Sequence, residues 1–239
     1  MGDNVPRPAP LFRSDTGVTL LGGGALGPGD LDAALALAPR LVAADGGAAA
    51  ALEAGHMPEA VYGDMDSLPD AARAKIPAAR IHTVPEQEST DFDKALRHIV
   101  APVVLAAGFT GARVDHELAV YHVLAARAAA RCIVIGSADL VLHAPPRLAL
   151  DLPAGTRLSL FPLAEVTGRS EGLAWPIDGL AFHPARRIGT SNRTTGSRVA
   201  LDFDGPGMLL ILPRAALARA AAALASASVW SRTAPPGSV

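Results

Sequence analysis

"VTLLGGGALGPGDLDAALALAPRLVAAD", residues 18–45, contains the pattern that decides the fold. An apolar strand-like run over 18–24 leads into a helical stretch, and a second apolar run follows over 40–45. The alternation continues with strand-like runs over 60–64, 80–85, 102–108 and 132–137, and with helical stretches that include 90–100 and 116–130. Near-continuous apolar strands between helices predict a mostly parallel sheet covered by helices on both faces. In such a sheet, ligands bind beyond the carboxyl ends of the strands.

The composition changes after residue 145. From there the chain has only short strand-like runs, over 156–163, 187–192, 198–203 and 207–213, separated by Gly and Pro turns. This pattern is typical of an antiparallel β-sandwich or a barrel-like domain. We therefore expect a flexible N-terminal segment over 1–17, an α/β domain over 18–145 and a β-rich domain over 146–239 that ends in a helical tail.

Composition and charge narrow the class of protein. The 239 residues are 50% hydrophobic and 18% charged, which is typical of a globular protein. The net charge of −2 gives no electrostatic case for nucleic acid or for an anionic membrane surface. Cys132 is the only cysteine and lies in an apolar run, so we expect a buried small hydrophobe. The N-terminal segment lacks the apolar core of a signal peptide, and no uncharged run of 18 apolar residues occurs, which predicts a cytoplasmic protein.

The stretch "GGGALG" (22–27) allows three interpretations. It matches the dinucleotide-binding pattern, with Asp45 placed to meet a ribose hydroxyl. Against this, Pro28 and Gly29 interrupt the point where the phosphate-binding helix should begin, and Asp45 is followed by two more glycines. The glycines also suit close packing of one backbone on another, or a close approach of the backbone to some other nucleotide.

Carboxylates follow the predicted strands at the edge where ligands bind. Asp45, Asp64 and Asp66 each lie at or just after the end of a strand, and Asp91 opens a helix for which Thr90 is a suitable N-cap. Each one alone is explained by a turn or by a favourable charge at a helix N-terminus. Gathered together they would repel each other and resist ionisation, so the set favours a bound cation. Oxygen ligands without His or Cys indicate Mg²⁺.

A third motif is "GFTGARVDHELA" (108–119), where a strand ends in a glycine-containing loop before a helix. Arg113 is of the type that binds phosphate oxygens bidentately. Asp115 either caps the helix or holds an acceptor group, and we interpret His116 as a surface residue of the helix.

Together these motifs resemble the thiamine pyrophosphokinase family. The corresponding segments here are "ADGG" (44–47), "GDMDS" (63–67), "EQESTDFDKAL" (86–96) and "GFTGARVDH" (108–116). In the second half, "GLAWPIDG" (172–179) and "GTSN" (189–192) resemble the family's β domain. The resemblance spans roughly residues 18–213, and its motifs occur in the family's order and spacing.

The resemblance implies a Mg²⁺-dependent transfer of pyrophosphate from ATP to the hydroxyl of thiamine, which gives thiamine diphosphate and AMP. It assigns the ATP and metal sites to 18–145 and thiamine binding to 146–239, in a homodimer with active sites at the subunit interface. Carried over residue by residue, the implied metal ligands are Asp64, Asp66, Asp91 and Glu88. The implied ATP contacts are Asp45, Ser67, Gln87, Thr90, Lys94 and Arg113. Ser191 and Asn192 would approach thiamine from the partner subunit, and Asp115 would line the acceptor side.

The sequence departs from the family at two positions. Glu86 and Glu88 stand where the family usually has Asp, which leaves open whether they bind metal. The general base is also open, with Asp115 and its acidic neighbours as candidates. The alternatives are pyrophosphoryl transfer to another alcohol such as a hydroxymethyl-pterin, a non-catalytic nucleotide- or thiamine-binding module, and a dinucleotide-dependent oxidoreductase.

Overall fold

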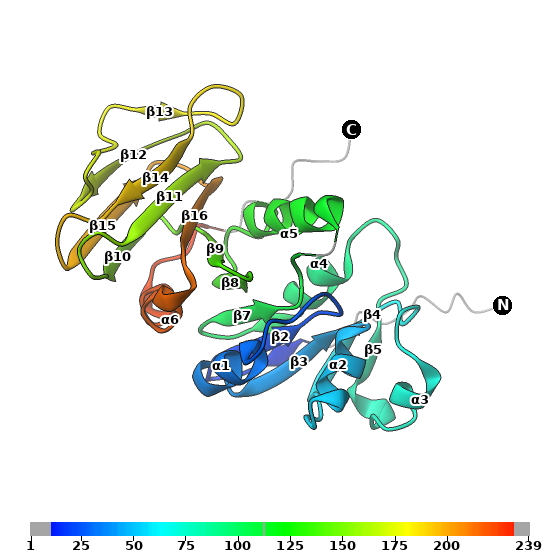
Figure 1. Cartoon of the computed structure of the whole chain (residues 1–239). Coiled ribbons are helices and arrows are strands. Elements are labelled where there is room, and N and C mark those ends of the chain that lie inside the picture. Colours follow the sequence, from blue (N-terminus) through cyan, green and yellow to red (C-terminus); the bar gives the residue numbers. More distant parts are fainter. Residues whose placement is uncertain (1–10, 112, 232–239) are drawn as a thin grey trace.

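The computed structural model describes residues 11–111 and 113–231 (Figure 1). In its N-terminal part, parallel strands alternate with helices as the sequence predicts. The strands are β1 (Phe12–Arg13), β2 (Val18–Leu21), β3 (Arg40–Ala44), β4 (Ala60–Gly63), β5 (Ile81–Thr83), β6 (Ile99–Val100), β7 (Val104–Ala107) and β8 (Cys132–Ile135). The helices are α1 (Asp30–Leu37), α2 (Gly47–Glu53), α3 (Asp70–Arg73), the 3-10 turn Ala78–Arg80, α4 (Asp91–Leu96) and α5 (Val114–Ala126).

The C-terminal part is antiparallel. Its strands are β9 (Asp139–His143), β10 (Arg147–Asp151), β11 (Arg157–Pro162), β12 (Val166–Glu171), β13 (Ala181–Phe182), β14 (Gly189–Arg193), β15 (Arg198–Phe203) and β16 (Met208–Pro213). The 3-10 turn Arg214–Ala216 and helix α6 (Leu217–Ser226) follow. The predicted fold class, an α/β domain followed by an antiparallel β domain, is confirmed.

One sheet runs through both parts of the protein. Its order is β14-β11-β16-β9-β8-β7-β2, and the parallel trio β3-β4-β5 lies beside β2 (Figure 1). Strand β9 turns back antiparallel to β8 and pairs with β16, so the sheet continues past residue 145. The second sheet, β10-β15-β12-β13, packs its apolar face against this continuation, and their side chains share one core. The C-terminal part is therefore a β-sandwich joined to the α/β part by shared strands.

Burial explains why the two parts have different strand patterns. All residues of β2, β4, β7 and β8 are buried, because helices cover both faces of the sheet there. Leu105 of β7 packs in the cluster that contains α1, whereas its neighbours Val104 and Ala106 pack with α4 and α5. In β10, by contrast, buried and exposed residues alternate, as expected for a sheet with one face in solvent.

Two local predictions are corrected. The helix expected over 90–100 ends at Leu96, and β6 follows and pairs in parallel with β1. The β-branched Ile99 and Val100 fit this strand better than a continued helix. Of the segment expected to be flexible, residues 1–10 lie outside the described residues, while Phe12–Arg13 forms β1.

Two further predictions concern Cys132 and the helices. Cys132 is 1% exposed, which confirms that it is a buried hydrophobic residue. In the described part of the chain, every helix is too short or too polar to cross a lipid bilayer.

Candidate active site

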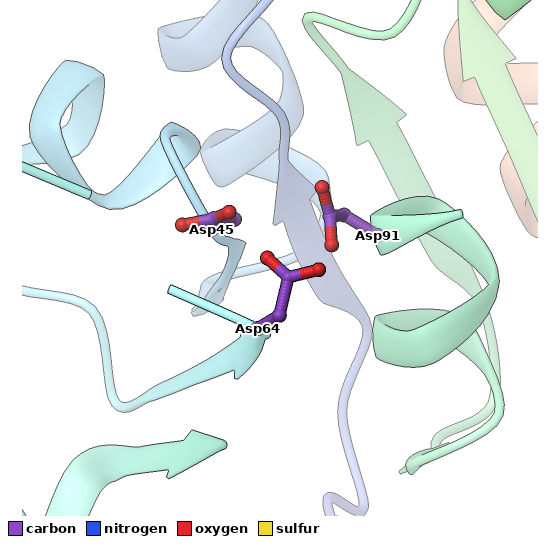
Figure 2. A group of neighbouring side chains, drawn as sticks. All are labelled: Asp45, Asp64 and Asp91. Carbon is purple, nitrogen blue, oxygen red and sulfur yellow. The ribbon is translucent and has the colours of Figure 1, made fainter. Parts of the chain in front are cut away.

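Three carboxylates meet at the carboxyl edge of the sheet (Figure 2). Asp45 follows β3, Asp64 follows β4, and Asp91 is the first residue of α4. One oxygen from each lies within 4.8 Å of the others, and the three side chains point toward a common centre. The neighbouring parallel strands β3 and β4 end at the same edge, so two residues far apart in sequence are brought together there.

The backbone around Asp45 is shaped to aim its carboxylate inward. Its φ of 39° lies in the left-handed region, which is uncommon for a residue other than glycine. A Cβ on Gly63 would lie 2.8 Å from the Cβ of Asp45, so this close strand pairing requires glycine. Asp45 Oδ2 accepts from the N–H of Ser67 at 3.2 Å, whereas the buried Oδ1 has no hydrogen-bond partner among the described residues. Burial, together with the charges of Asp91 and Asp66, raises the pKa of Asp45 to about 6.

Lys94 supplies positive charge to the other two carboxylates. Its Nζ is 2.7 Å from Asp64 Oδ2 and 3.4 Å from Asp91 Oδ1, and its side chain is 2% exposed. Gln87 Nε2 donates to the same oxygen of Asp64 at 3.1 Å. The hydrogen bond from Lys94 lowers the pKa of Asp64. Burial raises the pKa of Asp91 despite Lys94, and the two carboxylates raise the pKa of Lys94 although burial opposes this.

Asp66 and Ser67 form the turn beside this group. Ser67 Oγ donates to Asp66 Oδ1 at 2.9 Å, and the Asp66 N–H donates to Asp64 Oδ1 at 3.4 Å. Asp66 is exposed and is not one of the three converging carboxylates. It lines the same cavity, however, and it adds negative charge to the rim of that cavity.

The cavity over these carboxylates measures about 660 Å³. It brings together nine of the residues singled out from the sequence: Asp45, Asp64, Asp66, Ser67, Gln87, Thr90, Asp91, Lys94 and Arg113. Thr90 is the N-cap of α4, as predicted, because its side chain accepts from the Asp93 N–H at 3.3 Å. A volume of this size suits a small-molecule ligand.

Two predicted residues of the α/β part do not join this cavity wall. Glu88 is exposed and lies neither on the wall nor in the three-carboxylate group. The side chain of Asp115 is 65% exposed and pairs with Arg113, with Nη2 at 2.6 Å from Oδ2. The alternative that Asp115 caps α5 is wrong, because the N-cap is Arg113 and makes no side-chain capping hydrogen bond. The role of Asp115 on the acceptor side stays a prediction.

Ser191 and Asn192 lie on β14, within the β-sandwich and off the wall of the same chain's cavity. Ser191 is exposed and has a φ of 62°. The amide of Asn192 holds the loop of Trp175: Nδ2 donates to the Trp175 carbonyl at 2.7 Å, and Oδ1 accepts from the Trp175 N–H at 3.2 Å. Trp175 is 57% exposed, and the Arg193 guanidinium lies 5.4 Å from the centre of its ring. The roles of Ser191 and Asn192 in binding remain predictions.

The glycine-rich loop after β2 does two things at once. A Cβ on Gly22 or Gly24 would lie 2.5 or 2.7 Å from the Gly108 carbonyl oxygen, so two loops pack backbone to backbone here. Gly23 and Gly24 also line the cavity. Helix α1 begins only at Asp30, after the interruption that the sequence showed. The geometry combines close backbone packing with a backbone wall for a ligand.

Sequence reasoning missed part of the cavity wall. Phe92 and Phe109 line it, with ring centroids 4.7 Å apart, and His116 lines it as well, although the sequence suggested only a surface role. The signal for Phe109 was its place in the glycine-containing loop at the end of β7. For Phe92 and His116, the sequence offered only their proximity to Asp91 and Arg113.

Fold and site together define an α/β protein with an acidic, lysine-balanced candidate metal site at the carboxyl edge of its sheet. Residues 31–135 match the family model described as "Thiamin pyrophosphokinase, catalytic domain". The resemblance found in the sequence is thereby confirmed, and all three converging carboxylates lie within the matched residues. No curated protein sequence matches the chain.

Solved structures of thiamin pyrophosphokinases share the fold. Thiamin pyrophosphokinase from Geobacillus thermodenitrificans matches with a TM-score of 0.67 and 23% identity, over 82% of this chain and 96% of its own. The enzyme from Candida albicans matches with a TM-score of 0.70 and 13% identity, over 87% and 94%. Yeast thiamin pyrophosphokinase matches with a TM-score of 0.64 and 16% identity, over 89% of this chain and 94% of its own. These matches extend across both the α/β part and the β-sandwich.

Proposed function

We propose that this protein is a Mg²⁺-dependent thiamine diphosphokinase, which transfers the pyrophosphate group of ATP to the hydroxyl of thiamine and releases AMP. The observation that carries the proposal is the convergence of Asp45, Asp64 and Asp91 around one centre, inside the segment that matches the family's catalytic domain. The oxygen-only donor set and the unpartnered, buried Asp45 Oδ1 fit a hard divalent cation. We assign the metal to these three carboxylates, with Asp66 at the rim, and Glu88 stays a further candidate ligand.

A bound Mg²⁺ would neutralise phosphate charge and help hold the triphosphate in place. The chain itself would position the nucleotide. Lys94 and Arg113 would offer cationic groups to the phosphates, and Gln87 and Thr90 would offer polar groups from the loop before α4. The backbone of Gly23 and Gly24 forms another part of the cavity wall. Fixing both reactants in this way is the main requirement of phosphoryl-type transfer. The general base remains open between Asp115 and its acidic neighbours.

We propose further that the active form is a cytoplasmic homodimer with active sites at the subunit interface. Ser191 and Asn192 lie off the cavity wall of their own chain, so their proposed contact with thiamine requires a second copy. Val114 and Leu118 on α5 are 76% and 62% exposed, beside an apolar groove of about 700 Å³ between α5 and the sheet. An exposed apolar surface of this kind is typical of an interface.

The test is a chromatographic product assay with purified protein, MgATP and thiamine, run with and without EDTA. Equal amounts of AMP and thiamine diphosphate, formed only with Mg²⁺, are expected. Asp64→Asn should lower the formation of both products at least ~10²-fold, whereas Asp32→Asn, the same change on the exposed surface of α1, should leave them unchanged. AMP without thiamine diphosphate would reject thiamine as acceptor and direct attention to pterin alcohols. No nucleotide consumption by folded protein would favour a binding module.

Shared active sites have a separate test. Asp64→Asn and Asn192→Ala change opposite halves of the proposed composite site. If the sites are shared, mixing the two inactive variants under subunit exchange should restore roughly a quarter of wild-type activity, because half of the dimers then contain one intact site. Absence of any recovery, with heterodimers present, would contradict a site shared between subunits.

A further inference from the structure

Glu86 lies on the loop between β5 and α4, beside the candidate metal site, and its carboxylate is fully engaged within the protein. Oε2 accepts from the N–H groups of Glu88 at 2.9 Å and Ser89 at 3.0 Å. Oε1 accepts from Ser89 Oγ and from Arg97 Nη2, the latter at 2.7 Å. A carboxylate has about four acceptor positions, and these four donors use them. Glu86 therefore keeps no free lone pair for a metal.

The contacts of Glu86 continue as a chain of ion pairs into two helices. Arg97, which binds Glu86, also forms an ion pair with Asp93 on α4, with Nη1 at 3.5 Å from Oδ2. Asp93 is held in turn by Arg127 at the C-terminal end of α5, with Nε at 2.6 Å from Oδ1 and Nη2 at 2.8 Å from Oδ2. The side chain of Asp93 is only 8% exposed, so the carboxylate side of this bidentate pair is shielded from solvent, whereas Arg127 is 40% exposed. The loop is thus fastened to α4, and α4 to α5.

The turn over 86–89 and the start of α4 carry the groups that face Asp64. Gln87, which donates to Asp64 at 3.1 Å, lies inside the turn that Glu86 closes. Thr90 and Asp91 follow directly as the N-cap and first residue of α4. The spacing of Asp91 from Asp64 therefore depends on where this turn places the start of the helix.

We propose that Glu86 is a positioning residue, which fastens the turn over 86–89 and thereby sets Gln87 and Asp91 against Asp64, and is not itself a metal ligand. The proposal rests on the proposed function for the identity of the ligand, MgATP. The charge state of Glu86 suits this role: burial opposes its ionisation, but hydrogen bonds from Ser89 and Arg97 lower its pKa to about 2. It therefore stays ionised at any pH at which the protein would work.

The experiment compares Glu86→Ala and Glu86→Gln with Glu59→Ala. Glu59 makes a similar pair with Arg40, and its side chain is 32% exposed against 35% for Glu86, but it lies away from the cavity. Hydrogen exchange is measured first, on metal-free protein without substrate. Glu86→Ala should speed exchange of the Glu88 and Ser89 amides by about tenfold or more, because both lose a charged acceptor. Glu86→Gln, which retains a carbonyl acceptor, should fall between this variant and wild type.

Kinetics and metal binding then separate positioning from ligation. Glu86→Ala should raise KM for MgATP by about tenfold while KM for thiamine and the unfolding temperature stay near those of Glu59→Ala. Affinity for Mn²⁺ alone should fall by less than about tenfold, since all three carboxylates remain. Unchanged exchange at both amides, or a loss of Mn²⁺ affinity above about a hundredfold, would overturn the proposal. If exchange responds as expected but no thiamine diphosphate forms in the wild type, the proposed function fails and the positioning of the turn stands.

Discussion

Lys94→Met tests whether the lysine neutralises the acidic group. The Lys94 side chain is 2% exposed and the Asp64 side chain 13%, so their ion pair at 2.7 Å is largely buried. Removing one partner of a buried pair costs ~3–5 kcal/mol, because the other charge is left uncompensated. Asp64 keeps its hydrogen bond from Gln87 and some solvent contact, so we expect the lower end, ~3 kcal/mol. For a chain of this length, that corresponds to a fall of roughly 6–12 °C in unfolding temperature.

The measurement is thermal unfolding after EDTA treatment, repeated across a Mg²⁺ titration. A divalent cation replaces the missing positive charge, so saturating Mg²⁺ should recover at least half of the lost stability. Mg²⁺ should also bind about tenfold more tightly to Lys94→Met, since no ammonium competes for the oxygen of Asp64. Lys75→Met is the matched control, because Lys75 is exposed and is the chain's only other lysine. Wild-type stability and wild-type Mg²⁺ affinity in Lys94→Met would refute the reasoning.

Three further predictions concern the proposed metal ligands, a buried histidine and a tightly packed glycine. Asp64→Asn and Asp91→Asn should each lower turnover at least ~10²-fold in the product assay, and near-normal rates in both would remove the case for the metal site. Burial lowers the pKa of His143 to about 4, so the folded protein resists its protonation. About 3 kcal/mol of stability should therefore be lost as the pH falls from 6.5 to 4, and urea unfolding of His143→Gln should show a correspondingly flatter pH dependence. A Cβ on Gly47 would lie 2.1 Å from a backbone carbonyl oxygen, so Gly47→Ala should cost about 3 kcal/mol in urea unfolding, whereas Gly196→Ala, with no atom near, should be neutral.

The parallel part of the sheet could be predicted because strands that are buried on both faces consist almost entirely of apolar residues. Strands β2, β7 and β8 are apolar throughout except for Thr19, which is buried and donates to the Ala38 carbonyl at 2.7 Å. The β-sandwich was harder to predict. Strand β12 reads "VTGRSE" and owes its place to pairing with β15 and β13, which no local pattern announces. Strand β10, by contrast, has the alternating pattern "RLALD", which is a local signal for a half-buried strand.

The gathering of carboxylates was predictable for a topological reason. Asp45 and Asp64 end neighbouring parallel strands, so a parallel sheet brings them to one edge whatever their side-chain conformations. The partner of each side chain was not predictable. Arg113 forms an ion pair with Asp115, two residues away, and Asn192 donates a hydrogen bond to the backbone carbonyl of Trp175. Such choices depend on distances of a few tenths of an ångström after packing, and spacing along the chain does not encode them.

The charge balance of the site argues for a divalent cation over a monovalent one. Asp45, Asp64 and Asp91 together carry three negative charges when ionised, and Lys94 returns one, so the group keeps an excess of two. Burial already makes this excess unfavourable, since it raises the pKa of both Asp45 and Asp91. One divalent ion would remove the excess in a single binding event, whereas a monovalent ion would leave a net negative charge where the proposed function places the triphosphate of ATP. In the proposed site, the lysine that stabilises the metal-free protein would therefore also set the charge of the ion that fits best.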